Sequence, residues 1–353
     1  MENQTHIMPI GHNQLDEIVA VHLASREPMF LWGSPGGGKS AHLESAVTKC
    51  GYVYNDMRMA EKDTADVRGV PKPVQVTVGE FTEWVTQWAR PSDLPSHDCP
   101  PTVINLDELQ QAHQSVGVLA GRLVNERKIG DYTLNDNVVV FGASNLHTDR
   151  AGANRMLSHT ANRFMHYELM IDAHQWTGDY AVSADIDPRV IGFIRFRPEL
   201  VYKFDPKDAS PAFPSLRMWE KLSNVLKHVE NNNLVLLNAV SCGAVGMAVG
   251  SEFVGFCRGL DRLPDIQAII ADPDAHDDPV EPDLRYAVGS ALARFSDEDN
   301  IENIWQYMVK LPAEYQVLFA KDVVANTSNS GFDLTQHSVY TAIINLHQDM
   351  LTQ

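Results

Sequence analysis

The chain has 353 residues and a formal net charge of −18 at pH 7. This length is too great for one compact core and predicts about two domains, while the negative charge argues against a general electrostatic hold on nucleic acid or anionic lipid. The amino terminus lacks the pattern of a signal peptide, and the 4 cysteines are widely spaced without zinc-finger partners, so we expect reduced thiols in the cytoplasm rather than a metal site or a disulfide framework.

A glycine-rich stretch follows an amphipathic segment at residues 13–25, with a possible cap at Asn13, and an apolar run at 29–32. It precedes a predicted helix over 41–49 and fits G-x-x-x-x-G-K-[ST] in the strand-loop-helix context that binds phosphate. We expect Lys39 to reach the β- and γ-phosphates of ATP and the Ser40 hydroxyl to bind Mg²⁺. A plain glycine-rich turn is the alternative, but it has no use for this lysine and serine. The residues predicted to contact the nucleotide are Gly33, Ser34, Pro35, Gly36, Gly37, Gly38, Lys39, Ser40 and Ala41.

The pattern loosens between residues 56 and 94, after a second predicted strand at 51–55. Residues 74–78 alternate like one arm of a hairpin, and we interpret about 70–92 as an insertion that projects from the α/β unit. Trp84 and Trp88 follow at helical spacing. For these two side chains, packing beneath the insertion is favoured over a ligand cage.

Two acids end the apolar strand predicted over 102–108. Carboxylates at the carboxyl end of a parallel strand face the crevice where such sheets bind ligands. We expect Asp107 to hold the magnesium shell and Glu108 to polarise the attacking water. After a helix at 112–125 and a hairpin-like excursion at 128–132, a further strand over 138–143 leads to Asn145. Its side chain is placed to reach the γ-phosphate or the lytic water, and a simple turn residue is the alternative.

Two arginines lie beyond the last strand predicted for this unit, Arg155 and Arg163. From there neither has an obvious route to its own phosphates, but an arginine supplied to a neighbouring copy stabilises charge in phosphoryl transfer. We assign this role to Arg163. The motif spacing leaves Arg155 open, and a surface ion pair is the alternative for both.

The second half has no strand pattern beyond residue 172, and helices are predicted over 187–197, 215–229, 283–294, 301–311 and 335–350. Residues 234–256 are mostly apolar, but their polar residues and glycines favour two buried helices with a break near Gly250 over a membrane span. Arg217, in the first turn of one helix, opposes the helix dipole, which a bound anion would offset. These patterns predict an α/β nucleotide-binding domain at 1–180 and an all-helical lid at 181–353.

The order of these segments resembles that of a MoxR-type AAA+ ATPase over nearly the whole chain. Residues 33–40 stand where the family has Walker A, 106–108 at the end of Walker B, Asn145 at sensor one, 162–164 around the arginine finger and 216–217 at sensor two. Residues 58–71 are similar to the family signature that precedes its helix-two insertion. The resemblance implies a P-loop AAA+ module with a parallel sheet, followed by an all-α lid. It also implies a ring, usually a hexamer, that remodels or activates other proteins as a chaperone, often with a partner carrying a von Willebrand factor A domain.

Two other functions fit the same phosphate loop. A nucleic-acid motor or loader is disfavoured by the charge and by the lack of a basic tail or DNA-binding module. A small-molecule kinase does not explain the helical lid or residues 58–71. The ATPase hypothesis takes segments near 74–83 and 130–135 to face the ring axis and touch the client. Its catalytic residues are Lys39, Glu108, Asn145, Arg163 and Arg217, with Ser40 and Asp107 at the metal.

Overall fold

The computed structural model describes residues 7–146, 156–208, 210–230, 233–260, 265–327 and 331–351. The chain divides into two compact units, Met1–Met170 and Ile171–Gln353. The sequence patterns placed this division somewhat later, after residue 180. Arg155, the second candidate for the arginine finger, lies outside the described residues.

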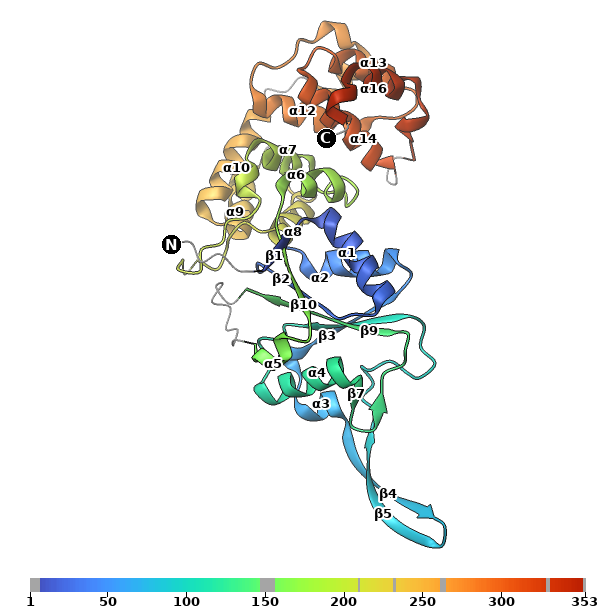
Figure 1. The fold of residues 1–353 in the computed structure, drawn as a ribbon. Coiled ribbons are helices and arrows are strands. Elements are labelled where there is room, and N and C mark those ends of the chain that lie inside the picture. Colours follow the sequence, from blue (N-terminus) through green and yellow to red (C-terminus); the bar gives the residue numbers. More distant parts are fainter. Residues whose placement is uncertain are drawn as a thin grey trace. The chain divides into compact units, whose positions relative to one another are not determined.

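The first unit is built on a parallel sheet that has 6 strands among the residues described, in the order β1-β10-β2-β9-β6-β3 (Figure 1). The strands are β1 (Met8–Ile10), β10 (Met165–Leu169), β2 (Met29–Gly33), β9 (Val138–Asn145), β6 (Thr102–Asp107) and β3 (Val53–Arg58). β2 is buried at every position, as expected for a central strand of a parallel sheet with both faces covered. The sequence patterns missed β1 and β10.

Helices cover both faces of this sheet (Figure 1). On one face α1 (His12–Ser25) and α2 (Lys39–Lys49) pack their apolar residues against side chains such as Leu31 and Phe141. On the other face α3 (Thr64–Arg68) and α4 (Gln114–Glu126) pack against Phe30 and Leu106, and α5 (Ser158–Ala161) contacts α4. α1 is capped by Gly11 rather than by the predicted cap Asn13. Alternate residues of β2 thus serve the two cores.

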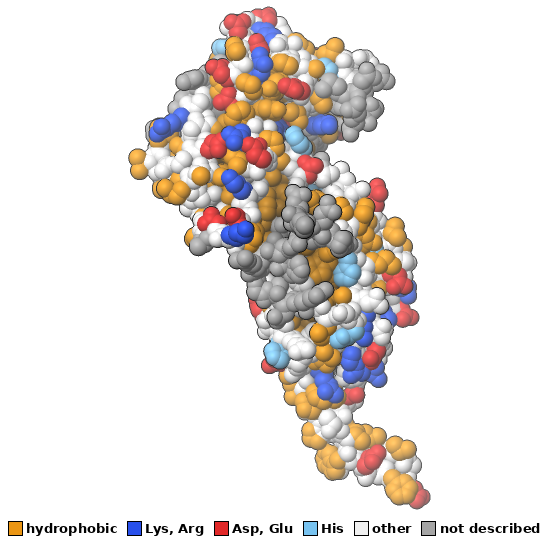
Figure 2. Space-filling model, turned by 60° about the vertical axis from the view of Figure 1, so that its left-hand side comes forward, with side chains coloured by type: hydrophobic (Ala, Val, Ile, Leu, Met, Phe, Trp, Pro, Cys, Tyr) orange, Lys and Arg blue, Asp and Glu red, His pale blue; other side chains and the backbone are white. Residues whose placement is uncertain are grey.

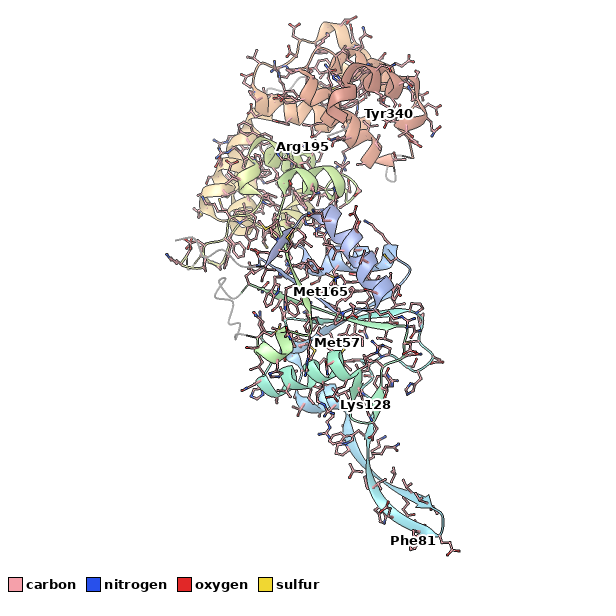
Figure 3. The ribbon with its side chains drawn as sticks, in the orientation of Figure 1. Met57, Phe81, Lys128, Met165, Arg195 and Tyr340 are labelled. Atoms are coloured by element: carbon pink, nitrogen blue, oxygen red, sulfur yellow. The ribbon has the colours of Figure 1, made fainter. Side chains whose placement is uncertain are left out.

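The predicted insertion is an antiparallel hairpin of β4 (Val70–Val78) and β5 (Phe81–Ala89). It projects from the unit with Phe81 at its free end (Figure 3). The helical spacing assigned to its tryptophans is wrong, because both lie on strand β5. Trp88 packs at the base, as favoured, with the Arg68 guanidinium 3.7 Å from its ring centroid, whereas Trp84 is 68% exposed. The predicted excursion is a short hairpin of β7 (Lys128–Ile129) and β8 (Tyr132–Thr133).

The regular secondary structure among the described residues of the second unit consists of helices. They are α6 (Ala173–Gln175), α7 (Pro188–Phe196), α8 (Leu216–Leu226), α9 (Leu234–Val245), α10 (Met247–Leu260), α11 (Ile266–Ala271), α12 (Pro282–Phe295), α13 (Ile301–Met308), α14 (Ala313–Ala325) and α16 (Ser338–Leu351). They include all those predicted there and three more, α6, α11 and α14. Single turns of tighter or wider helix lie at Trp176–Tyr180, Pro198–Leu200, Pro273–Ala275 and Leu334–Gln336, and one at Met59–Glu61 in the first unit.

The apolar residues 234–256 form two helices as predicted, but the break is at Gly246 and not near Gly250. Gly246 has a φ of +86°, a left-handed conformation that glycine adopts readily. Gly250 lies inside α10, where a Cβ atom would come within 2.6 Å of the Cys242 backbone in α9. Its lack of a side chain therefore permits close packing of α9 and α10. Among the described residues, no helix is long and apolar enough to cross a membrane.

This close approach predicts the effect of Gly250→Ala. We expect the added methyl group to force α9 and α10 apart and to lower the free energy of unfolding by about 1–3 kcal/mol. Gly255→Ala in the same helix is the matched control, because a Cβ atom there has no neighbour within 4 Å. Urea unfolding should show a lower midpoint for the first variant only. Equal midpoints for the two variants would contradict the packing described here.

Candidate active site

The phosphate loop joins the end of β2 to the start of α2. Gly36 and Gly38 have φ values of +73° and +80°, which favour glycine at both positions. A Cβ atom on Gly33 would lie 3.1 Å from Cδ of Lys39, so the lysine stem passes close over this glycine. The predicted nucleotide-binding residues therefore form a tight loop that leads into the amino end of a helix, which is an anion-binding arrangement.

Lys39 is 9% exposed, and its amine points back to the carboxyl end of the sheet. It donates hydrogen bonds to the carbonyl oxygens of Gly33 and Ser34, at 2.9 and 3.0 Å, and to Oδ1 of Asn145 at 2.7 Å. Asn145 ends β9 and lies opposite Gly33 in the parallel register. The structure thus brings together the lysine and the asparagine that the sequence predicted for the γ-phosphate.

The predicted metal ligands, Ser40 and Asp107, are also in contact. The Ser40 hydroxyl donates to Oδ2 of Asp107 at 3.2 Å. Burial raises the pKa of the Asp107 carboxyl, and the negative charge of Asp56 raises it further, so a cation at this place would offset an unfavourable charge. A hydroxyl and one carboxylate fit Mg²⁺, which binds proteins through one or two carboxylates and takes its other oxygens from phosphates and water.

Glu108 has an unusual backbone conformation. Its φ is +54°, a left-handed conformation that is uncommon for a residue with a Cβ atom and that Arg26, Arg127 and Asp185 also adopt in this chain. The Glu108 N–H donates to Oδ1 of Asp107 at 3.0 Å, which holds the turn. In the described part of the chain, no hydrogen bond or ion pair engages the half-buried Glu108 carboxylate. It is therefore available to accept a proton from water.

Asp56, on β3, is a neighbour of the site that the sequence patterns missed. Its Oδ1 accepts hydrogen bonds from Nδ2 of Asn105 at 2.8 Å and from the hydroxyl of Tyr54 at 3.4 Å. Burial raises the pKa of the Tyr54 phenol, and Asp56 adds to this effect. The only sequence signal was Asn105, a polar residue inside an apolar strand. It needed a partner, which β3 supplies.

This arrangement predicts a pH effect for Asp56→Asn. The Asp107 carboxyl would have to be ionised to hold a cation, so we expect any activity that needs this cation to fall as the pH drops through the raised pKa of Asp107. Removing the charge of Asp56 lowers that pKa and should move the acid limb of kcat/KM to lower pH. Asp16→Asn is the control and should leave the limb in place, because Asp16 is a partly exposed carboxylate on α1 that pairs with Lys49. A limb that stays in place or moves upward in Asp56→Asn would contradict this electrostatic account.

Arg163 lies in the turn between α5 and β10. This turn is at the amino end of the parallel strands, whereas the phosphate loop is at their carboxyl end. Met165 pairs with Met29, the first residue of β2, whereas the phosphate loop follows its last. The guanidinium rests on α4, where a Cβ atom on Gly121 would come within 2.6 Å of Nη1. It forms no hydrogen bond or ion pair with any residue whose structure is described, so the alternative of a surface ion pair is not seen among those residues.

Arg217 belongs to the second unit. It is exposed in the first turn of α8, which Ser215 caps by accepting from the Met218 N–H at 3.4 Å. Its role at the phosphates therefore stays a prediction.

Neither a family model nor a curated protein matches this sequence. Similar solved structures include a RuvB variant from Thermotoga maritima, with 14% identity over 85% of this chain and 88% of that chain and a TM-score of 0.39. A putative ATPase from Cytophaga hutchinsonii has 12% identity, coverage of 85% and 89% and a TM-score of 0.34. NtrX from Brucella abortus in complex with ADP has 11% identity, coverage of 95% and 68% and a TM-score of 0.33.

These likenesses are low, so the fold assignment rests on the strand order and the phosphate loop. β9, which carries Asn145, separates the phosphate-loop strand β2 from β6, which ends at Asp107. The predicted architecture is confirmed: an α/β unit with a parallel sheet and a phosphate loop after its strand β2 is followed by an all-α unit.

Proposed function

We propose that the chain is a Mg²⁺-dependent ATPase that works as a ring and couples hydrolysis to the remodelling or activation of a protein partner, as in the MoxR-type AAA+ family. One observation carries the proposal. The Lys39 amine contacts Asn145, and the Ser40 hydroxyl contacts Asp107, beneath one phosphate loop. A cation, a hydroxyl, a carboxylate and an amide at the amino end of a helix are the groups that phosphoryl transfer requires.

In this mechanism the amides of the loop bind the phosphate chain, and the Lys39 amine turns from the carbonyl oxygens to the β- and γ-phosphates. Mg²⁺ held by Ser40 and Asp107 would neutralise charge that develops on the phosphate oxygens. Glu108 accepts the proton of the attacking water. Asn145, beside the lysine, orients that water or the γ-phosphate.

We assign Arg163 to the nucleotide of an adjacent subunit. The length of β2 separates it from its own phosphate loop, at least about 13 Å for four strand intervals. A guanidinium without a hydrogen-bond or ion-pair partner among the described residues of its own chain is suited to an anion on another copy. Arg155 remains the alternative for this role, and Arg217 is proposed to contact the γ-phosphate from the lid.

The surface of the β4–β5 hairpin favours a protein as the partner of this chain. Val78, Phe81 and Trp84 are 69%, 83% and 68% exposed near its end, and Figure 2 shows apolar side chains gathered on this projection among polar ones. Residues 70–89 contain one lysine and two glutamates, which does not favour a phosphate backbone. Exposed apolar surface of this kind marks contacts with proteins, and a partner with a von Willebrand factor A domain is one such client.

The proposal is tested by the fate of the γ-phosphate. We expect purified protein to release inorganic phosphate from ATP into water only with Mg²⁺, without stimulation by DNA, and Lys39→Ala to abolish the release. DNA-stimulated turnover that falls steeply with salt would support a nucleic-acid motor instead. Phosphate found on an added metabolite would support a kinase.

A further inference from the structure

Four ring side chains join the phosphate-loop strand to the turn that carries Arg163. Phe30 and Trp32 extend from β2. Phe164 immediately precedes the adjacent strand β10, and His166 lies within it. The ring centroids of Phe30 lie 4.6 Å from Trp32 and 5.3 Å from Phe164, and those of Trp32 and His166 lie 5.8 Å apart. Gly142 on β9 leaves room for them, because a Cβ atom there would lie 2.6 Å from the Phe30 ring.

His166 forms two hydrogen bonds within this cluster. Nε1–H of Trp32 donates to Nδ1 of His166 at 2.9 Å, and Nε2 of His166 lies 2.8 Å from the carbonyl oxygen of Ala161. Nδ1 must accept and Nε2 must donate, so both bonds require the neutral ring with its proton on Nε2. The imidazole therefore connects an indole on the phosphate-loop strand to a backbone carbonyl next to Arg163.

That carbonyl closes the turn around the arginine. The Ala161 oxygen also accepts the Phe164 N–H at 3.1 Å, so Arg163 lies within the turn that His166 holds. At the other end, Trp32 is bonded to Gly33, whose carbonyl accepts from the Lys39 amine at 2.9 Å. Covalent and hydrogen bonds thus connect Lys39, at the carboxyl end of the strands, with the turn of Arg163 at their amino end.

We propose that Trp32 and His166 are positioning residues that aim Arg163 at the nucleotide of the adjacent subunit, which rests on the proposed function above. With no partner for its guanidinium among the described residues, Arg163 is directed by its backbone turn and by the space over Gly121. Misplacing a catalytic group by about 1 Å costs on the order of 10²-fold in rate. An indole donor in a buried apolar strand needs an acceptor, and His166 provides it.

Trp32→Phe and His166→Phe keep an aromatic ring at each position and remove the hydrogen bonds, while the ring becomes smaller at position 32 and larger at position 166. We expect each to lower kcat by about 10- to 100-fold with little change in KM for ATP. His166→Gln keeps one acceptor and one donor and should recover part of the rate. His22→Phe is the matched control. His22 is a buried histidine that, like the half-buried His166, makes two hydrogen bonds, 3.0 Å to the Tyr167 hydroxyl and 2.9 Å to the Glu27 carbonyl oxygen, on the face of the sheet that α1 covers. It should keep kcat.

Mixed assemblies test where the defect lies. Glu108→Gln chains keep Arg163 but lack the proposed base, and Arg163→Ala chains keep the base, so a mixture of the two should regain turnover. Adding His166→Phe to the Glu108→Gln chain should reduce that recovery by about tenfold or more. His166→Phe chains mixed with Glu108→Gln chains should recover, since their own nucleotide site is intact.

The outcomes separate the two proposals. Full recovery with the doubly substituted chain, or equal loss of kcat in His22→Phe and His166→Phe, would overturn the positioning role and leave the ATPase proposal standing. If Glu108→Gln and Arg163→Ala chains failed to complement each other, the shared site itself would be refuted, and the positioning role with it.

Discussion

Glu108→Gln is expected to bind ATP about as tightly as the native chain and to hydrolyse it about 10²–10⁴-fold more slowly. The glutamine has nearly the same size and keeps hydrogen-bonding capacity, so the turn at φ +54° and the Asp107 contact are retained. It cannot take a proton from water. Fluorescent-nucleotide titration gives the affinity, and phosphate release gives the rate.

Glu126→Gln is the matched control for this substitution, since Glu126 is an exposed carboxylate of the same unit and pairs with Arg122 at 2.9 Å. It should turn over normally. Wild-type hydrolysis by Glu108→Gln would show that another group activates the water, and Asp107 and Asp56 are the other carboxylates placed there.

Arg163→Ala is expected to retain ATP binding and lose on the order of 10³-fold of the turnover that depends on assembly. The guanidinium makes no hydrogen bond or ion pair with the residues that the structure describes, so its removal should cost little stability, and the melting temperature should stay near that of the native protein. The rate is measured against protein concentration, because a shared site is active only when copies associate.

Arg122→Ala serves as the control for Arg163→Ala. Arg122 lies on the same region of α4 but is held by Glu126, and we expect its removal to change turnover little. Equal rates for Arg163→Ala and the native chain would transfer the role to Arg155 or remove it altogether.

Much of this fold was predictable because the central strands are buried on both faces. β2, β6 and β9 therefore appear in the sequence as apolar runs that end in functional residues. β10 was missed because Met-His-Tyr-Glu-Leu carries polar side chains, which here make hydrogen bonds with α1 and with Trp32. Residues four apart share a face in both helices and strands, so the spacing of Trp84 and Trp88 could not distinguish the two.

The local parts of the site were equally predictable, and the nonlocal parts were not. Lys39 and Ser40 follow from the motif, since the loop fixes their geometry within a few residues. Asp56 and His166 depend on which strands lie side by side, and the single sequence does not fix the partner of β3 or of β10. Gly246 and Gly250 are both glycines, so the sequence does not distinguish their roles. The structure shows that Gly246 ends α9 and that Gly250 permits close packing of α9 and α10.

The central claim is that the terminal phosphate of ATP is shared between two copies of this chain. Sedimentation of Glu108→Gln with Mg²⁺ and ATP, compared with the nucleotide-free protein, tests it most directly. We expect ATP-bound closed assemblies that dissociate when Lys39→Ala is added to the same chain. A Glu108→Gln protein that binds ATP and stays monomeric across concentration would contradict the claim.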